Sequence, residues 1–278
     1  MRIPFFCVAI MTGAVALAAP QQSSAPVAPQ EPSYADLADF ALASKITAHV
    51  RIRSAQPLRG EFASGTAAGF QRLLVTADLL ALMKAPEGQQ PQVKYIIDLP
   101  FDSRGKLPKL RKVESLVFAQ PARVGEWQLI APNAAITWTL ARETTLRAIL
   151  AEAARPDSPP QVRGIASAFH SAGSLPGEGE TQIFLDTADN RPASLTVQRR
   201  AGQTPIWFVS LDEVVDEGVS QPPANSLLWY RLACFLPDQM PESVTQGQNA
   251  DDSRQVAEDY QLVRTALGSC ARTMSAAR

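Results

Sequence analysis

The chain has 278 residues, 46% of them hydrophobic, and its 26 lysines and arginines almost balance its 27 aspartates and glutamates. This hydrophobic share is ordinary for a globular protein. The formal net charge of −1 provides no overall positive potential that would attract nucleic acid. No apolar segment beyond the N-terminus approaches membrane-spanning length, so we expect a soluble product that does not span a membrane.

Residues 1–18 predict a signal peptide. Arg2 supplies the positive charge, residues 3–17 are apolar and uncharged, and residues 16–18 form a small-x-small cleavage site. The apolar run is shorter than the about 20 residues that cross a bilayer, which favours cleavage over anchoring. We therefore expect a periplasmic or secreted protein. Residues 19–33 are rich in Pro, Ala, Gln and Ser and predict a disordered linker.

The N-terminal half predicts a small β domain. Ser33 and Asp36 can cap a helix over residues 33–44. Several short strands favour a closed barrel, because closure removes exposed edges. His49 lies on the polar face of the first strand, which predicts a surface position. Alternating or apolar runs predict these strands at residues 46–53, 70–83, 93–99, 115–119 and 127–131.

The order of these elements resembles the OB-like barrels of exported netrin-type and tissue-inhibitor-type domains. The resemblance covers residues 35–135. It is carried by residues 79–84, which end the second strand, and by residues 112–119, a charged turn that leads into an apolar strand. It implies an OB-like fold. The N-terminal cysteine typical of the inhibitors is absent, so the resemblance does not imply inhibition of metalloproteases.

The second half predicts a smaller domain. A helix over residues 139–154 is followed by the Pro-rich segment 155–160, which predicts a domain boundary. Beyond it, strands are expected at residues 162–169, 181–186, 193–199 and 206–211, and helices at residues 226–236 and 251–267. We therefore predict an α+β fold in which an OB-like β-barrel domain with flanking helices (34–154) precedes a smaller α+β domain with two C-terminal helices (161–270) and a disordered tail (271–278).

Residues 177–185 and 227–237 resemble stretches of uncharacterised exported proteins of sphingomonad-type alphaproteobacteria. This resemblance implies export, in agreement with the predicted signal peptide. It implies no chemistry.

Two cysteines remain once Cys7 leaves with the signal peptide. Cys234 and Cys270 would lie in an oxidising compartment, so we predict a disulfide between the two C-terminal helices in preference to two buried thiols. A bridge between Cys234 and Cys270 would close a loop of about 36 residues, which stabilises a fold by roughly 3–4 kcal/mol. Neither of the 2 histidines is close in sequence to these cysteines, so we expect no metal site.

The strongest candidate for an interaction site is a basic loop in which Gly105 and Pro108 break any helix. An exposed loop of this kind can meet an anionic surface such as lipid headgroups or a polyanion, or it can be a solvated hairpin. No aromatic residue interleaves with the cations, so base stacking is not expected. The candidate binding residues are Arg104, Lys106, Lys109, Arg111 and Lys112.

A second candidate site is centred on His170. Ser167 and Glu180 could complete a hydrolase site with it, but the G-x-S-x-G nucleophile motif is absent, and an ordinary hydrogen-bonded histidine is the simpler interpretation. Residues 177–181 lack the third glycine and the following helix of a phosphate-binding loop. An acidic cluster also lacks the spacing of a calcium loop; its members are Asp212, Glu213, Asp216 and Glu217.

We expect an exported, soluble, non-enzymatic binding or structural protein with no cofactor, whose partner is an anionic surface or another envelope protein. The alternative is a periplasmic hydrolase that uses His170 with a nearby serine or carboxylate. A hydrolase would place His170 in a concave pocket beside a second polar side chain, whereas a binding protein would show a continuous apolar or basic patch.

Overall fold

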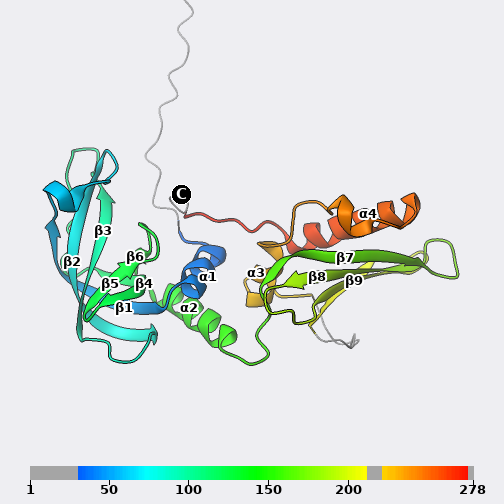
Figure 1. Cartoon of the computed structure of the whole chain (residues 1–278), viewed down its shortest axis with the longest axis horizontal. Helices are drawn as coiled ribbons and strands as arrows, with labels where there is room; N and C mark the ends of the chain where they lie inside the picture. The colour runs from blue at the N-terminus through cyan, green and yellow to red at the C-terminus, as the bar shows by residue number, and fades with distance from the viewer. Residues whose placement is uncertain (1–30, 212–220, 275–278) are drawn as a thin grey trace, which may run out of the picture. The chain divides into compact units, whose positions relative to one another are not determined.

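Figure 1 shows the computed structural model, which describes residues 31–211 and 221–274. The chain from Glu31 onward forms one compact unit. The predicted signal peptide, most of the predicted linker and the acidic cluster lie outside the described residues. Within the described residues the fold is α+β, as the sequence predicts, with a barrel in the N-terminal half, a second sheet and C-terminal helices.

The predicted OB-like barrel is present and closed. The strands pair in the order β1-β2-β3-β5-β4, and β4 pairs back onto β1. β3 and β5 run parallel and pair at one position, Lys94 with Glu126. A short strand, β6 (Ala135–Thr137), pairs with β4. The barrel strands are β1 (Ile46–Pro57), β2 (Phe70–Lys84), β3 (Gln92–Pro100), β4 (Glu114–Arg123) and β5 (Glu126–Leu129).

Alternation along the strands fills the barrel. Val93, Tyr95 and Ile97 of β3 are buried, while the residues between them are exposed. β1 shows shifts of register at several points along its ladder with β2. Such bulges bend a strand and increase its twist. The bends let β1 pair with β2 along most of its length and with β4 over its first half.

Two helices flank the barrel in the sequence. α1 (Tyr34–Ala43) begins with the predicted capping box, in which the Asp36 N–H donates to the Ser33 hydroxyl and the Ser33 N–H donates to the Asp36 carboxylate. α2 (Leu140–Ala153) begins at Thr139, whose hydroxyl caps the first turn.

The second half of the chain forms an antiparallel meander in the order β10-β9-β8-β7. Two helices follow it, as predicted, and α4 runs along β7 in Figure 1. Two single turns of 3-10 helix lie in loops, at Gly60–Ala63 and Glu242–Thr245. The elements are β7 (Val162–Ala172), β8 (Gly179–Thr187), β9 (Ser194–Arg199), β10 (Ile206–Ser210), α3 (Leu227–Ala233) and α4 (Ala250–Leu267).

The chain beyond α4 is fixed at two places. Cys234 and Cys270 form the predicted disulfide, with Cα atoms 5.0 Å apart. The Thr273 N–H and hydroxyl donate to the Asp36 carboxylate at 3.0 and 2.7 Å. The tail predicted from residue 271 therefore does not begin there, because α1 offers these residues a hydrogen-bond acceptor.

One apolar core joins α1 and α2 to the second half of the chain. Leu37 of α1 and Ile149 of α2 belong to the same buried cluster as Ile183 of β8 and Tyr260 of α4. The barrel interior forms a second buried cluster. The predicted boundary at residues 155–160 therefore does not coincide with a division between cores, because α1 and α2, which precede it, share a core with the second sheet. Helical periodicity identifies a buried face and cannot identify what covers it.

Candidate functional site

The predicted basic residues lie together on the loop that connects β3 to β4. The Asp102 carboxylate accepts the backbone N–H groups of Arg104 and Lys106 at 2.9 and 2.8 Å and closes the first turn of the loop. Leu107 and Leu110 are half-buried against the barrel core. The five predicted cations are all exposed, and none of them forms an ion pair with a described residue.

This loop is also fixed where it enters β4. Lys112 has a φ of 69°, in the left-handed region, and its N–H donates to the Ile52 carbonyl at 2.8 Å. The Ile52 N–H donates in return to the Val113 carbonyl at 2.8 Å. The cations therefore stand on a backbone that is hydrogen-bonded to β1.

Two exposed aromatic side chains lie at the base of the loop. Phe70 and Phe101 are 42% and 40% exposed. Phe70 pairs across the sheet with Pro100, and the Phe101 N–H donates to the Gly69 carbonyl at 3.0 Å, so the backbone at Phe101 lies beside the start of β2. Sequence reasoning missed them because they flank the loop and do not interleave with its cations. We call the five cations and these two phenylalanines the basic patch.

The structure does not bring His170, Ser167 and Glu180 together. His170 Nδ1 lies 2.9 Å from the hydroxyl oxygen of Thr181, which donates to the Asp259 carboxylate. Glu180 precedes Thr181 on β8 and so lies on the opposite face of the sheet. Ser167 is exposed farther along β7. The side chain that positions His170 is therefore Thr181, which the sequence analysis did not select.

The hydrogen bonds around His170 connect strands of the second sheet to α4. Asp259 also pairs with Arg199 at 2.5 Å, so one buried carboxylate joins β8 and β9 to α4. Gly179 makes room for the imidazole, because a Cβ atom there would lie 2.6 Å from His170 Cε1. His170 lines neither the groove on the barrel beside β3 and β5 nor the cavity where β2 meets α1, α2 and α3, and Thr181 is fully buried. No observation on the described residues favours the hydrolase alternative.

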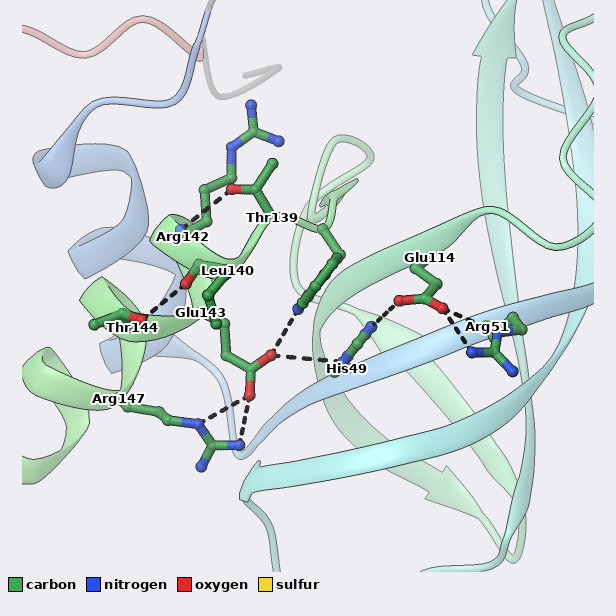
Figure 2. Close-up of polar contacts among 10 residues, drawn as sticks. His49, Arg51, Glu114, Thr139, Leu140, Arg142, Glu143, Thr144 and Arg147 are labelled. Carbon is green, nitrogen blue, oxygen red and sulfur yellow. Dashed lines mark hydrogen bonds and ion pairs between the residues drawn. The ribbon is translucent and has the colours of Figure 1, made fainter.

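His49 is buried, not at the surface as predicted, with 8% of the residue exposed. Figure 2 shows its imidazole between two glutamates: Nε2 lies 2.9 Å from Glu114, and Nδ1 lies 3.5 Å from Glu143. The ring stacks on Trp138 with centroids 4.7 Å apart, and the Trp138 indole donates to Glu143 at 2.6 Å. We call these four residues the histidine clamp, because they tie β1 and β4 to the start of α2.

Both carboxylates of the histidine clamp already have cationic partners. Arg51 pairs with Glu114 at 2.7 Å and Arg147 with Glu143 at 2.6 Å (Figure 2). Hydrogen bonds from Trp138 and Arg147 hold the pKa of Glu143 below its ordinary value, and Arg51 has the same effect on the pKa of Glu114. The clamp is therefore a structural tie between elements. Sequence reasoning missed it because helical periodicity placed Glu143 away from the apolar side of its helix.

A groove of about 800 Å³ lies on the barrel beside β3 and β5, which pair at only one position. Its lining is largely apolar and includes Leu58, Phe62, Leu74, Ile96 and Ile130. The face formed by strands 2 and 3 and the neighbouring loops is the ligand surface of many OB folds. The groove is therefore a second candidate site, which sequence reasoning did not find.

Tyr95 lines the same groove and has a hydroxyl group without a partner. The residue is 2% exposed, and no described residue forms a hydrogen bond with this hydroxyl. Burial raises the pKa of Tyr95, so the hydroxyl keeps its proton. An unpaired buried polar group costs about 1–3 kcal/mol, and a ligand in the groove could supply the missing partner.

Two further findings concern metal ligands and membrane spans. No group of three or more His, Cys, Asp or Glu side chains among the described residues is placed to hold a metal ion. No helix in this part of the chain is long and apolar enough to cross a membrane. The chain matches no protein-family model and no curated protein.

Proposed function

We propose that this chain is an exported binding protein without catalytic chemistry, and that its OB-like barrel docks through the basic patch on an anionic lipid surface. One observation carries the proposal. Five exposed cations stand on a loop that is held to the barrel, without a carboxylate partner among the described residues and beside two exposed phenylalanines.

The chemistry of the basic patch favours lipid over a soluble polyanion. Each lysine or arginine close to an anionic leaflet contributes about 1 kcal/mol of attraction. Apolar side chains next to cations can insert below the headgroups, which adds a hydrophobic contribution that a dissolved polyanion does not offer. Phe70 and Phe101 are exposed next to the loop and would make that insertion.

Binding to vesicles tests the proposal. The protein should sediment with phosphatidylcholine vesicles that contain phosphatidylglycerol and not with phosphatidylcholine alone. Binding should weaken steeply between 0.1 and 1 M salt, because the screening length falls from about 10 Å to about 3 Å. The triple variant K109S/R111S/K112S should bind roughly a hundredfold more weakly, since three cations supply about 3 kcal/mol. Its melting temperature should stay nearly unchanged, because exposed charges contribute little to stability.

A matched control removes three exposed cations elsewhere, in the variant K45S/R123S/R200S. This control should bind vesicles as the parent does. If it loses as much affinity as the patch variant, overall charge drives binding and the proposal is wrong. The variant F70S/F101S should lose vesicle binding while its weaker affinity for polyphosphate stays the same. Equal loss on both ligands would also contradict insertion into lipid.

Export is tested separately by N-terminal sequencing. The protein recovered from the periplasm should begin at Ala19, after the predicted cleavage site. A soluble cytoplasmic product with Met1 intact would contradict export.

The groove favours a second candidate function, binding of an extended peptide segment. From Tyr95 to Pro100, β3 pairs with β2 only, so its other edge is open to the groove. An extended segment could add to this edge by backbone hydrogen bonds and place apolar side chains against Leu74 and Ile96. The variant I96D should abolish such binding, as measured with a library of extended peptides, and an unchanged set of bound peptides would contradict it.

A further inference from the structure

A cavity of about 730 Å³ lies where the end of β2 meets α1, α2 and α3. Much of its wall is apolar. Leu42 of α1, Met83 of β2, Leu150 of α2 and Phe235, which follows α3, all line it. A volume of this size is typical of sites that enclose a small molecule. β2 runs from Phe70 in the basic patch to this cavity, so the two features lie at opposite ends of one strand.

Two cations line the cavity without an anionic partner among the described residues. Lys84 Nζ donates to the Ala41 carbonyl at 3.0 Å and forms no ion pair with a described residue. Arg231 Nε is buried and has no hydrogen-bond partner within the described part of the chain. The Arg231 guanidinium lies 5.8 Å from the ring centroid of Tyr230, which gives it an aromatic neighbour but not a counter-ion. Burial lowers the pKa of both cations, as expected for charges that lack a partner.

The carboxylate that lines the cavity does not neutralise these cations. Asp39 accepts a hydrogen bond from the Tyr230 hydroxyl at 2.6 Å and another from Arg272 at 2.6 Å. Its charge is therefore compensated by Arg272. Asp189 attracts Arg231 through space, but it pairs with Arg191 and forms no contact with Arg231. Within the described part of the chain, the cavity thus carries an excess of positive charge on a partly apolar wall.

We propose that this cavity binds a single-chain anionic amphiphile, whose carboxylate or phosphate pairs with Arg231 and Lys84 and whose alkyl chain lies against Met83, Leu150 and Phe235. A partly buried cation is costly until an anion pairs with it, and an apolar wall is costly until apolar surface covers it. An amphiphile satisfies both needs at once. The proposal does not depend on docking at a membrane, because the cavity and the basic patch share no residue.

Titration calorimetry with ten-carbon probes tests the site, at concentrations below micelle formation. Decanoate and decyl phosphate should both bind with one site per chain, and the tighter of the two identifies the preferred headgroup. Decyltrimethylammonium carries the opposite charge and should not bind. The variants Arg231→Gln and Lys84→Gln should each weaken decanoate binding by about tenfold or more, since hydrogen bonds between charged groups are lost. The control Lys45→Gln removes an exposed cation outside the cavity and should leave binding unchanged.

Methyl NMR locates the probe without any substitution. In protein labelled at the methionine methyl groups, decanoate should shift the signal of Met83, while Met240 and Met274 do not line the cavity and should not move. The proposal is overturned if decanoate fails to bind, if the cationic probe binds as tightly, or if binding leaves the Met83 signal in place. The NMR experiment uses the wild-type chain, so it tests the proposal even if a cavity variant fails to fold.

Discussion

At the scale of single residues, the unpaired hydroxyl group of Tyr95 offers the clearest test of the groove. Replacing Tyr95 with Phe removes a buried polar atom that has no partner on the described residues and leaves the ring in place. We expect the free energy of unfolding to rise by about 1 kcal/mol, because the desolvation cost of the hydroxyl disappears. Urea denaturation monitored by circular dichroism measures the change. A loss of stability would mean that the hydroxyl has a partner, such as an ordered water molecule.

Asp36 links stability to pH. Its burial favours the neutral acid, but hydrogen bonds from Thr273 and Ser33 outweigh burial and hold the pKa of Asp36 below its ordinary value. A carboxyl whose pKa is lower in the folded state contributes stability that is fully present above its unfolded pKa of about 3.9 and is lost as the pH falls through the lower folded value. We therefore expect the wild type to lose stability below about pH 4 more steeply than the variant Asp36→Asn. Urea denaturation at a series of pH values measures this. An equal loss of stability with falling pH in the two proteins would refute the prediction.

At the scale of elements, we expect the histidine clamp to contribute more to the free energy of unfolding than a surface ion pair does. The variant Glu143→Ala takes away the acceptor for the Trp138 indole and one of the two carboxylates beside His49. We expect a loss of about 1–3 kcal/mol in the free energy of unfolding, because the half-buried indole N–H is left without an acceptor and the buried imidazole loses a charged neighbour. The control Glu87→Ala, at an exposed turn, should change stability by less than about 0.5 kcal/mol. If chemical denaturation shows equal losses of stability in both variants, the clamp does not stabilise the fold more than an exposed residue does.

The elements themselves were largely predictable from the sequence, and their partners were not. Alternation predicted the barrel strands, and the Ser33 capping box marked the start of α1. Periodicity assigns a side chain to one face of an element and does not reveal what lies opposite. It therefore predicts a surface position for His49 and does not reveal that Glu143, which lies away from the apolar side of its helix, meets His49. The groove and the cavity depend on segments far apart in the sequence. No local pattern encodes either of them.

At the scale of the whole molecule, the core shared by α1, α2 and the second sheet leads us to expect that the two sheets unfold together. The Pro-rich segment 155–160 carries no helix or strand, and we expect proteolysis at its exposed part, residues 155–157. α1 and α2 nevertheless pack in one buried cluster with β8 and α4. We expect a single cooperative thermal transition, in which the calorimetric and van't Hoff enthalpies agree. Two separate transitions would mean that the barrel and the second sheet fold independently.

Amide hydrogen exchange in the presence of vesicles tests the central claim, docking through the basic patch, most directly. Vesicles that contain phosphatidylglycerol should slow exchange over residues 101–113 and at Phe70. They should leave the turn at Val124 and Gly125 unchanged, since that turn joins β4 to β5 at the other end of the barrel and carries the most exposed apolar side chain in the barrel, Val124. Exchange that slows at this turn while residues 101–113 stay unchanged, or vesicle binding that slows neither segment, would contradict the account.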